Sequence, residues 1–244
     1  MKLGGKTGEN EERMRAQDQR KDSKIMLTLE TIKNDPLTSA LIQTADQHLK
    51  AMGYTEHGLR HVNLVSSIAQ NILLRLGFSE RQGELAAIAG YLHDIGNIAN
   101  RKDHGRTGAA MVFNYLLDKK MDPYEAAAIV GAIGNHEEEC GEAVNNIAAA
   151  LILADKSDVH RSRARNLDVA TQNIHDRVNY AAVHSFVNVD PKKKTITLEL
   201  KIDTGICSVM EYFEIFLERM MMCRRAATFL ECNFKIEING NMIL

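Results

Sequence analysis

The sequence predicts a mainly α-helical protein with a small C-terminal α+β appendage. Between residues 35 and 165, apolar side chains recur every three to four positions, which is the period of amphipathic helices. After residue 180 the period changes to two, which is typical of strands. We therefore expect a disordered polar tail over residues 1–24, a helical domain over 25–178 and the appendage over 179–244.

Start and stop signals delimit the first two helices. Asp35 followed by Pro36 is a typical helix start, with the aspartate as N-cap and the proline in the first turn, and Gly53 is a typical stop. These signals predict a helix over residues 37–52. A second helix is expected over residues 58–76, where one face is apolar.

Four more helices are expected before residue 170. Ser79-Glu-Arg-Gln82 has the form of a capping box, and Asp122-Pro123 repeats the start signal. The expected ranges are 79–92, 105–118, 122–136 and 143–165.

The appendage is predicted as a β-hairpin, a helix and a final strand. The hairpin strands span 183–189 and 195–202, the helix spans 208–230 and the last strand spans 233–238. Such a helix must cover its apolar face, either against its own sheet and the helical domain or against a second subunit. A homodimer through the appendage is therefore one of two expected arrangements, and the appendage would contribute at most a wall of the active site.

Composition indicates a folded protein without an obvious macromolecular partner. The 244 residues are 45% hydrophobic and 25% charged, which is average for globular chains. Thirty Lys and Arg oppose 32 Asp and Glu, so no charge excess points to nucleic acid or a membrane. Because the sequence shows neither a signal peptide nor an apolar run of membrane-spanning length, we expect a cytoplasmic protein.

Histidines and aspartates lie on apolar helix faces. His61 shares a face with Val65, and a buried imidazole needs a polar partner. Asp155 ends an apolar stripe, and His93-Asp94 lies at a helix end, so both carboxylates must be paired or bind a metal. Imidazole with carboxylate suits Mn, Fe, Co, Ni or Zn, and the lack of cysteine among these candidate ligands disfavours a closed structural zinc site.

The ordered set His61, His93-Asp94 and Asp155 resembles the HD-domain superfamily of metal-dependent phosphohydrolases. The resemblance extends over about residues 35–165 and includes the phrase LHDIG. It implies an HD-type helical bundle that hydrolyses a phosphate ester or anhydride, of a nucleotide-like small molecule, by metal-activated water.

Two further histidines complete the pattern H...HD...H...H...D, which resembles the binuclear subtype of this superfamily. His104 in DHGRTGAAMV and His136 in IGNHEE match the positions that supply ligands to a second metal. The resemblance implies two divalent transition-metal ions, Fe or Mn first, with Co, Ni, Zn or Mg as alternatives. Asp94 would bridge the ions. The implied ligands are His61, His93, Asp94, His104, His136 and Asp155.

The chain departs from one branch of the superfamily and shares a short segment with another. The cyclic-dinucleotide phosphodiesterase branch has HDIGK, a double histidine and a GYP loop, whereas this chain has Asn97 and Asn135-His136 and lacks GYP. The binuclear diadenosine-polyphosphate hydrolase branch has an HG..GA segment that His104-Gly105 and the following Gly-Ala resemble. That similarity does not define a substrate.

Several side chains are candidates for catalysis or substrate binding. Asp94 and Lys156 are the expected catalytic residues, the lysine stabilising charge on the phosphoryl group. Lys102, Arg106 and Arg161 are expected to bind phosphate oxygens. Alternatively, each of these lysine and arginine side chains is a solvated surface charge without a role in the site.

Three alternatives stay open at the level of sequence. His57 either reaches the site or caps a helix at the surface. The superfamily also contains di-iron oxygenases on the same ligand set, and oxygen uptake would identify one. The chain could instead be a non-enzymatic, metal-stabilised module for sensing or association.

The expected partner is a small phosphorylated substrate, with no membrane and no specific nucleic acid.

Overall fold

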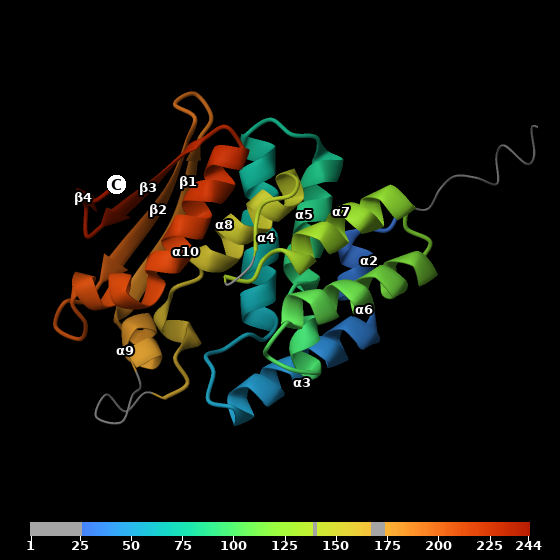
Figure 1. The fold of residues 1–244 in the computed structure, drawn as a ribbon, viewed down its shortest axis with the longest axis horizontal. Helices are drawn as coiled ribbons and strands as arrows, with labels where there is room; N and C mark the ends of the chain where they lie inside the picture. Colours follow the sequence, from blue (N-terminus) through green and yellow to red (C-terminus); the bar gives the residue numbers. More distant parts are fainter. Residues whose placement is uncertain (1–25, 139–140, 167–173) are drawn as a thin grey trace, which may run out of the picture.

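The computed structural model describes residues 26–138, 141–166 and 174–244. Within these ranges the chain forms a bundle of helices followed by a four-stranded sheet (Figure 1). The predicted fold class, mainly α with a small C-terminal α+β part, is confirmed. The predicted tail over residues 1–24 lies outside the described residues.

The helical part follows the predicted order, with short 3-10 turns at two connections. Asp35 caps its helix as predicted, because its carboxylate accepts the Leu37 N–H at 2.9 Å. Two short helices, α2 and α9, were not predicted. The elements are α2 (Leu29–Lys33), α3 (Pro36–Ala51), α4 (Leu59–Arg75), α5 (Glu80–Leu92), η1 (Ile95–Ile98), α6 (His104–Asp118), α7 (Pro123–Gly134), α8 (Asn146–Ser157), η2 (Arg161–Arg163) and α9 (Ile174–Ala181).

Helix α8 lies at the centre of the molecule. It packs against α4, α5, α7 and α10, and every residue from Ile147 to Ser157 is buried. A helix that is surrounded on all sides must be apolar all round, which explains its continuous run of alanine, leucine and isoleucine. Asp155 and Lys156 are therefore exceptions that need a polar or metal partner.

The prediction of one helix over residues 143–165 is wrong. Helix α8 ends at Ser157, and Asp158 leaves the helical conformation with φ −76° and ψ 74°. The Asp158 carboxylate contacts His61 and Arg60 on α4 instead of continuing the helix. A tertiary contact thus ends the helix, and local sequence patterns do not report such contacts.

The C-terminal unit consists of a sheet and one long helix. Its elements are β1 (Ala182–Asp190), β2 (Thr195–Ile202), α10 (Val209–Phe229), β3 (Asn233–Ile238) and β4 (Asn241–Met242), in the sheet order β1-β2-β3-β4. Strands β1 and β2 form the predicted antiparallel hairpin. Strand β3 pairs parallel to β2, because α10 makes the crossover between them.

Helix α10 connects this unit to the helical bundle. It lies along the sheet on one side and beside α8 on the other (Figure 1). Ser208 caps its start in a capping box with Glu211. Within the described residues, no helix combines the length and apolar character needed to cross a membrane.

Candidate metal centre

Six histidine and aspartate side chains converge where several helices end. They come from α4, α6, α8, the junction between α5 and η1 and the segment after α7, and each residue is at most 8% exposed. Groups of this polarity are buried together only when they satisfy one another or bind a cation. The residues are His61, His93, Asp94, His104, His136 and Asp155.

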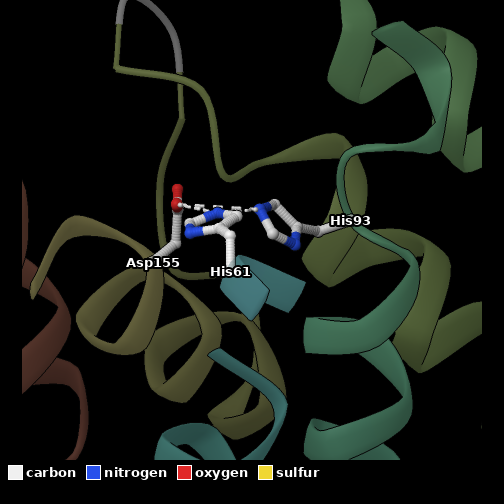
Figure 2. Close-up of side chains that lie close together, drawn as sticks. All are labelled: His61, His93 and Asp155. Atoms are coloured by element: carbon white, nitrogen blue, oxygen red, sulfur yellow. Dashed lines mark hydrogen bonds and ion pairs between the residues drawn. The ribbon is translucent and has the colours of Figure 1, made fainter. Parts of the chain in front are cut away.

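The side chains of His61, His93 and Asp155 surround one point. Nε2 of His61 lies 3.3 Å from Nε2 of His93 and 3.3 Å from Oδ1 of Asp155. Nε2 of His93 lies 3.6 Å from the same Asp155 oxygen. Figure 2 shows the two rings and the carboxylate directed toward each other. This geometry is that of three ligand atoms that could share an ion.

Asp94 presents its two oxygens to two different pairs of histidines. Oδ2 lies 3.2 Å from Nε2 of His93 and 3.6 Å from Nε2 of His61. Oδ1 lies 3.3 Å from Nε2 of His104 and 3.8 Å from Nε2 of His136. The second pair of rings is itself close, with 3.1 Å between their Nε2 atoms. One carboxylate thus lies between two groups of nitrogen atoms.

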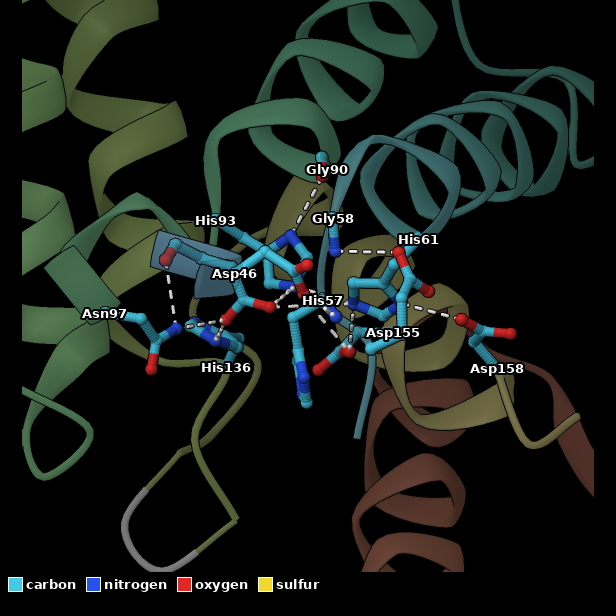
Figure 3. Close-up of polar contacts among 12 residues, drawn as sticks. Asp46, His57, Gly58, His61, Gly90, His93, Asn97, His136, Asp155 and Asp158 are labelled. Carbon is cyan, nitrogen blue, oxygen red and sulfur yellow. Dashed lines mark hydrogen bonds and ion pairs between the residues drawn. The ribbon is translucent and has the colours of Figure 1, made fainter. Parts of the chain in front are cut away.

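Each of the four imidazoles uses its other nitrogen, Nδ1, to contact an oxygen outside the cluster, and Figure 3 shows this for His61 with Asp158 and for His93 with Gly90. The acceptors are Asp158 Oδ2 for His61 at 2.7 Å, Gly90 O for His93 at 2.9 Å, Arg101 O for His104 at 2.9 Å and Ile133 O for His136 at 2.6 Å. A carbonyl or carboxylate oxygen only accepts, so Nδ1 carries the hydrogen and Nε2 is the nitrogen that is left to bind a proton or a metal ion. Inward-facing Nε2 lone pairs are the arrangement of metal-binding histidines.

These residues fit a divalent metal ion. The His61–His93 and His104–His136 pairs bring Nε2 atoms within 3.3 Å of each other, a contact that needs either a proton or a metal ion between the two nitrogens. Asp94 Oδ2 is buried and accepts no hydrogen bond from the described residues. Imidazole nitrogen with carboxylate oxygen suits Mn, Fe, Co, Ni or Zn.

The pKa values of the cluster show that its two carboxylates stay ionised and favour a positive charge beside them. Burial by itself would lower the pKa of His93, but the neighbouring Asp94 and Asp155 carboxylates outweigh it and raise that pKa to about 10. Burial would raise the pKa of the two carboxyls, yet the surrounding charges hold both well below the usual range. Burial lowers the pKa of His136 to about 4. A divalent ion would supply the positive charge that the carboxylates favour.

Backbone packing positions Asp94 relative to His104. A Cβ on Gly96 would overlap the carbonyl oxygen of His104 and lie 2.5 Å from the Gly108 nitrogen, so only glycine lets η1 and α6 approach this closely. The Asn97 amide donates to Asp94 O at 2.9 Å and to Asp94 Oδ1 at 3.0 Å. Asn97 therefore orients the carboxylate between the two histidine pairs.

The buried Asp158 carboxylate and the arginines around it hold His61 in place. Asp158 is 2% exposed, and besides His61 it accepts from Arg60 Nη2 at 2.8 Å. Arg163, which is 3% exposed, donates to the carbonyl oxygens of Asp158 at 2.9 Å and Glu56 at 3.1 Å. Burial would raise the pKa of Asp158, but the His61 hydrogen bond and the Arg163 charge hold it far below the usual range. Asp158 is thus ionised at neutral pH.

A small cavity opens onto the cluster and is lined by charged and polar side chains. Its lining residues are His57, Asp94, Arg101, His104, His136, Glu138, Asp155, Lys156, Arg163 and Arg219. Lys156, an expected catalytic residue, points its Nζ to Asp155 Oδ2 at 2.7 Å. His57 is buried, with its ring centroid 5.3 Å from that of His61, so it reaches the site and is not a surface histidine.

The expected phosphate-binding cations lie elsewhere. Lys102 is exposed, and Arg106 is exposed beside Asp103. The Arg161 guanidinium lies over the Tyr180 ring, 5.2 Å from its centroid. None of the three lines the cavity, and their role as substrate contacts stays a prediction.

Sequence reasoning missed three arginines that do line the cavity. Arg101 is four positions after Asn97, in the connection between η1 and α6, and its nearness to the LHDIG phrase could have drawn attention to it. Arg163 was placed in one helix over residues 143–165, whereas it lies in the separate 3-10 turn η2 after the end of α8. Arg219 comes from α10, and no sequence signal relates it to a site more than 60 residues earlier.

Residues 58–170 match the family model of the HD domain. This range contains all six converging residues, and the match supports the HD superfamily for this chain. HD domains are commonly metal-dependent hydrolases. The comparison with curated proteins found no match.

Proposed function

We propose that the protein is a metal-dependent phosphohydrolase with a binuclear centre that cleaves a phosphate ester or anhydride of a small, nucleotide-like molecule. The observation that supports it most is the placement of Asp94, whose two oxygens face two separate histidine pairs. A carboxylate in this position is suited to bridging two cations.

The donor atoms divide into two sets around that carboxylate. His61, His93 and Asp155 would hold one ion together with Asp94 Oδ2. His104 and His136 would hold a second with Asp94 Oδ1. When bound, such ions lower the pKa of water and neutralise charge on a phosphate. Manganese and iron are the metals we propose first, because the donors mix nitrogen and oxygen.

Side chains that line the cavity would orient the nucleophile and stabilise the phosphoryl group. Asp94, held by Asn97, would orient the nucleophile relative to the phosphate. Lys156 is 7% exposed and directed to the cavity, so its ammonium group would stabilise charge on the phosphoryl oxygens. We propose these two as the catalytic residues. A buried cation acts more strongly there than one in water, because the local dielectric constant is lower.

Self-association through the C-terminal unit belongs to the same proposal. Helix α10 covers the sheet with one face but leaves Met210, Leu217 and Met221 exposed on another. An apolar face of this kind supports contact with a second copy. The sedimentation mass of the full chain tests it, since a monomer would contradict the dimer.

The function is tested by metal analysis followed by activity. The protein is purified without chelator and assayed on phosphate monoesters, diesters and anhydrides with Mn, Fe, Co, Ni or Mg. We expect metal-dependent release of phosphate that Asp94→Ala abolishes. Oxygen uptake without hydrolysis would instead indicate a di-iron oxygenase on the same ligands. A folded, metal-loaded protein without turnover on the whole panel would indicate a sensing or association module.

A further inference from the structure

The cavity above the cluster is rich in cations that metal binding does not use. Four of its lining residues are Arg101, Lys156, Arg163 and Arg219, against three carboxylates. Among the lining residues that the structure describes, no aliphatic, Phe, Tyr or Trp side chain occurs. This composition suits an anionic, polar group and offers no surface for an apolar one.

Two of the four cations contact a residue of the metal centre or the backbone beside it. Lys156 lies 2.7 Å from Asp155 Oδ2. Arg163 directs Nη1 and Nε to the backbone oxygens of Asp158 and Glu56. Their positive charge contributes to the potential of the cavity. The Nη1 and Nε donors of Arg163 are already used, whereas the Lys156 ammonium group has three N–H donors and keeps some for a ligand.

Arg101 has donors to spare. Its guanidinium lies over the Tyr54 ring, 5.4 Å from the centroid, and Nη1 donates to Asn97 Oδ1 at 3.2 Å. It has no carboxylate partner among the residues that the structure describes. The stacking and the single hydrogen bond fix the plane of the group, so its other N–H groups are available to a ligand.

Arg219 enters the cavity from the C-terminal unit. Its guanidinium lies 4.6 Å from the centroid of the Phe216 ring on the same helix, and Nε lies 2.6 Å from Glu138 Oε1. The same glutamate oxygen lies 3.7 Å from Lys156 Nζ. Arg219 and Glu138 are both partly exposed, with 22% and 26% of their side chains accessible. A carboxylate therefore occupies the position where an anionic ligand would meet these cations.

Resting on the proposed function, we propose that Arg101 and Arg219 bind the phosphate group of the substrate and select terminal phosphate monoesters over diesters. Glu138 is the carboxylate that the phosphate displaces from Arg219 and Lys156. A terminal phosphate carries close to two negative charges and three free oxygens, whereas a diester carries one charge and two free oxygens. Two arginines beside metal ions favour the more highly charged group, since each can bind oxygens in pairs.

Binding of two small probes tests this selection. Inorganic phosphate and dimethyl phosphate are titrated calorimetrically into the manganese-loaded protein at mildly alkaline pH. We expect phosphate to bind at least about tenfold more tightly, and Arg219→Gln and Arg101→Gln each to weaken phosphate binding by about tenfold. Both variants should lose much less affinity for dimethyl phosphate and keep the metal content of the unmodified protein.

A matched control and a variant of opposite sign make the result specific. Arg225→Gln changes the same residue type on α10, but Arg225 is exposed and outside the cavity lining, so phosphate affinity should not change. Glu138→Gln removes the competing charge and should tighten phosphate binding severalfold. Unchanged phosphate affinity in Arg219→Gln, weaker binding in Glu138→Gln, or dimethyl phosphate bound as tightly as phosphate would overturn the proposal.

The outcome is independent of turnover. Phosphate binding with this pattern of gains and losses, in a protein that hydrolyses no ester, would support the anion site and contradict the proposed function. The opposite result is also informative. If both Arg219→Gln and Arg101→Gln keep the hydrolysis rate and the phosphate affinity of the unmodified protein, the proposed function is supported and the anion site is contradicted.

Discussion

Asp158→Asn should weaken metal binding although Asp158 is not one of the six converging residues. The Asp158 carboxylate accepts the Nδ1 hydrogen of His61 at 2.7 Å, which orients the ring and makes Nε2 a stronger donor to a metal. Asparagine has nearly the same shape but no charge. The variant therefore changes the electrostatics of His61 with little change in packing.

The size of the effect follows from what Asp158 contacts. Loss of such an outer partner typically lowers metal affinity by about 10–100-fold, which corresponds to about 1.4–2.8 kcal/mol. The metal-free protein should also lose stability, because Arg163 is buried beside Asp158. Arg163 keeps its two backbone acceptors, so we expect about 2–3 kcal/mol rather than the larger loss of a fully unpaired charge.

Competition with a chelating dye measures the manganese affinity, and urea unfolding of the metal-free protein measures stability. Asp190→Asn is the control, since Asp190 caps the β1–β2 turn and lies outside the cavity lining. It should leave metal affinity unchanged. A folded Asp158→Asn protein that binds manganese within twofold of the unmodified protein would refute the role assigned to the His61 contact.

Three further predictions concern the bridge, the packing and the pH. Asp94→Ala should abolish hydrolysis and lower the metal content, which elemental analysis checks; full metal loading would contradict the bridge. Gly96→Ala should lower the free energy of unfolding by about 3 kcal/mol through overlap with His104, measured by urea denaturation. Gly131→Ala, which meets no atom closer than 3.5 Å, should not, and equal effects would contradict the steric reasoning. The pKa of the Asp94 and Asp158 carboxyls is lowered on folding, so their stabilisation is complete above about pH 4 and lost as pH falls. Thermal unfolding at acid pH should show this loss, and Asp158→Asn should reduce it.

Much of the fold could be predicted because its signals are local. The N-caps at Asp35 and Ser79 and the alternation of β2 each depend on neighbouring residues. The end of α8 could not be predicted in the same way. Asp158 leaves the helix to reach His61, nearly a hundred residues earlier in the chain.

The residues of the candidate site differ in the same way, since some have a local sequence signal and others do not. His61 and Asp155 were identifiable because a polar side chain on an apolar helix face requires a partner, and the structure brings them within 3.3 Å. Arg219 was not identifiable, because an arginine on an amphipathic helix is ordinarily a surface charge. Its relation to the site depends on how α10 packs beside α8, which is a property of the tertiary structure.

The number of metal ions per chain tests the central claim most directly. Elemental analysis of metal-replete protein, normalised to protein concentration, should give about two ions per chain for a binuclear centre. His136→Ala should reduce this to about one, because His61, His93 and Asp155 remain together. A fully loaded protein that holds one ion, and keeps it when His136 is replaced, would contradict a second metal position and with it the bridging role of Asp94.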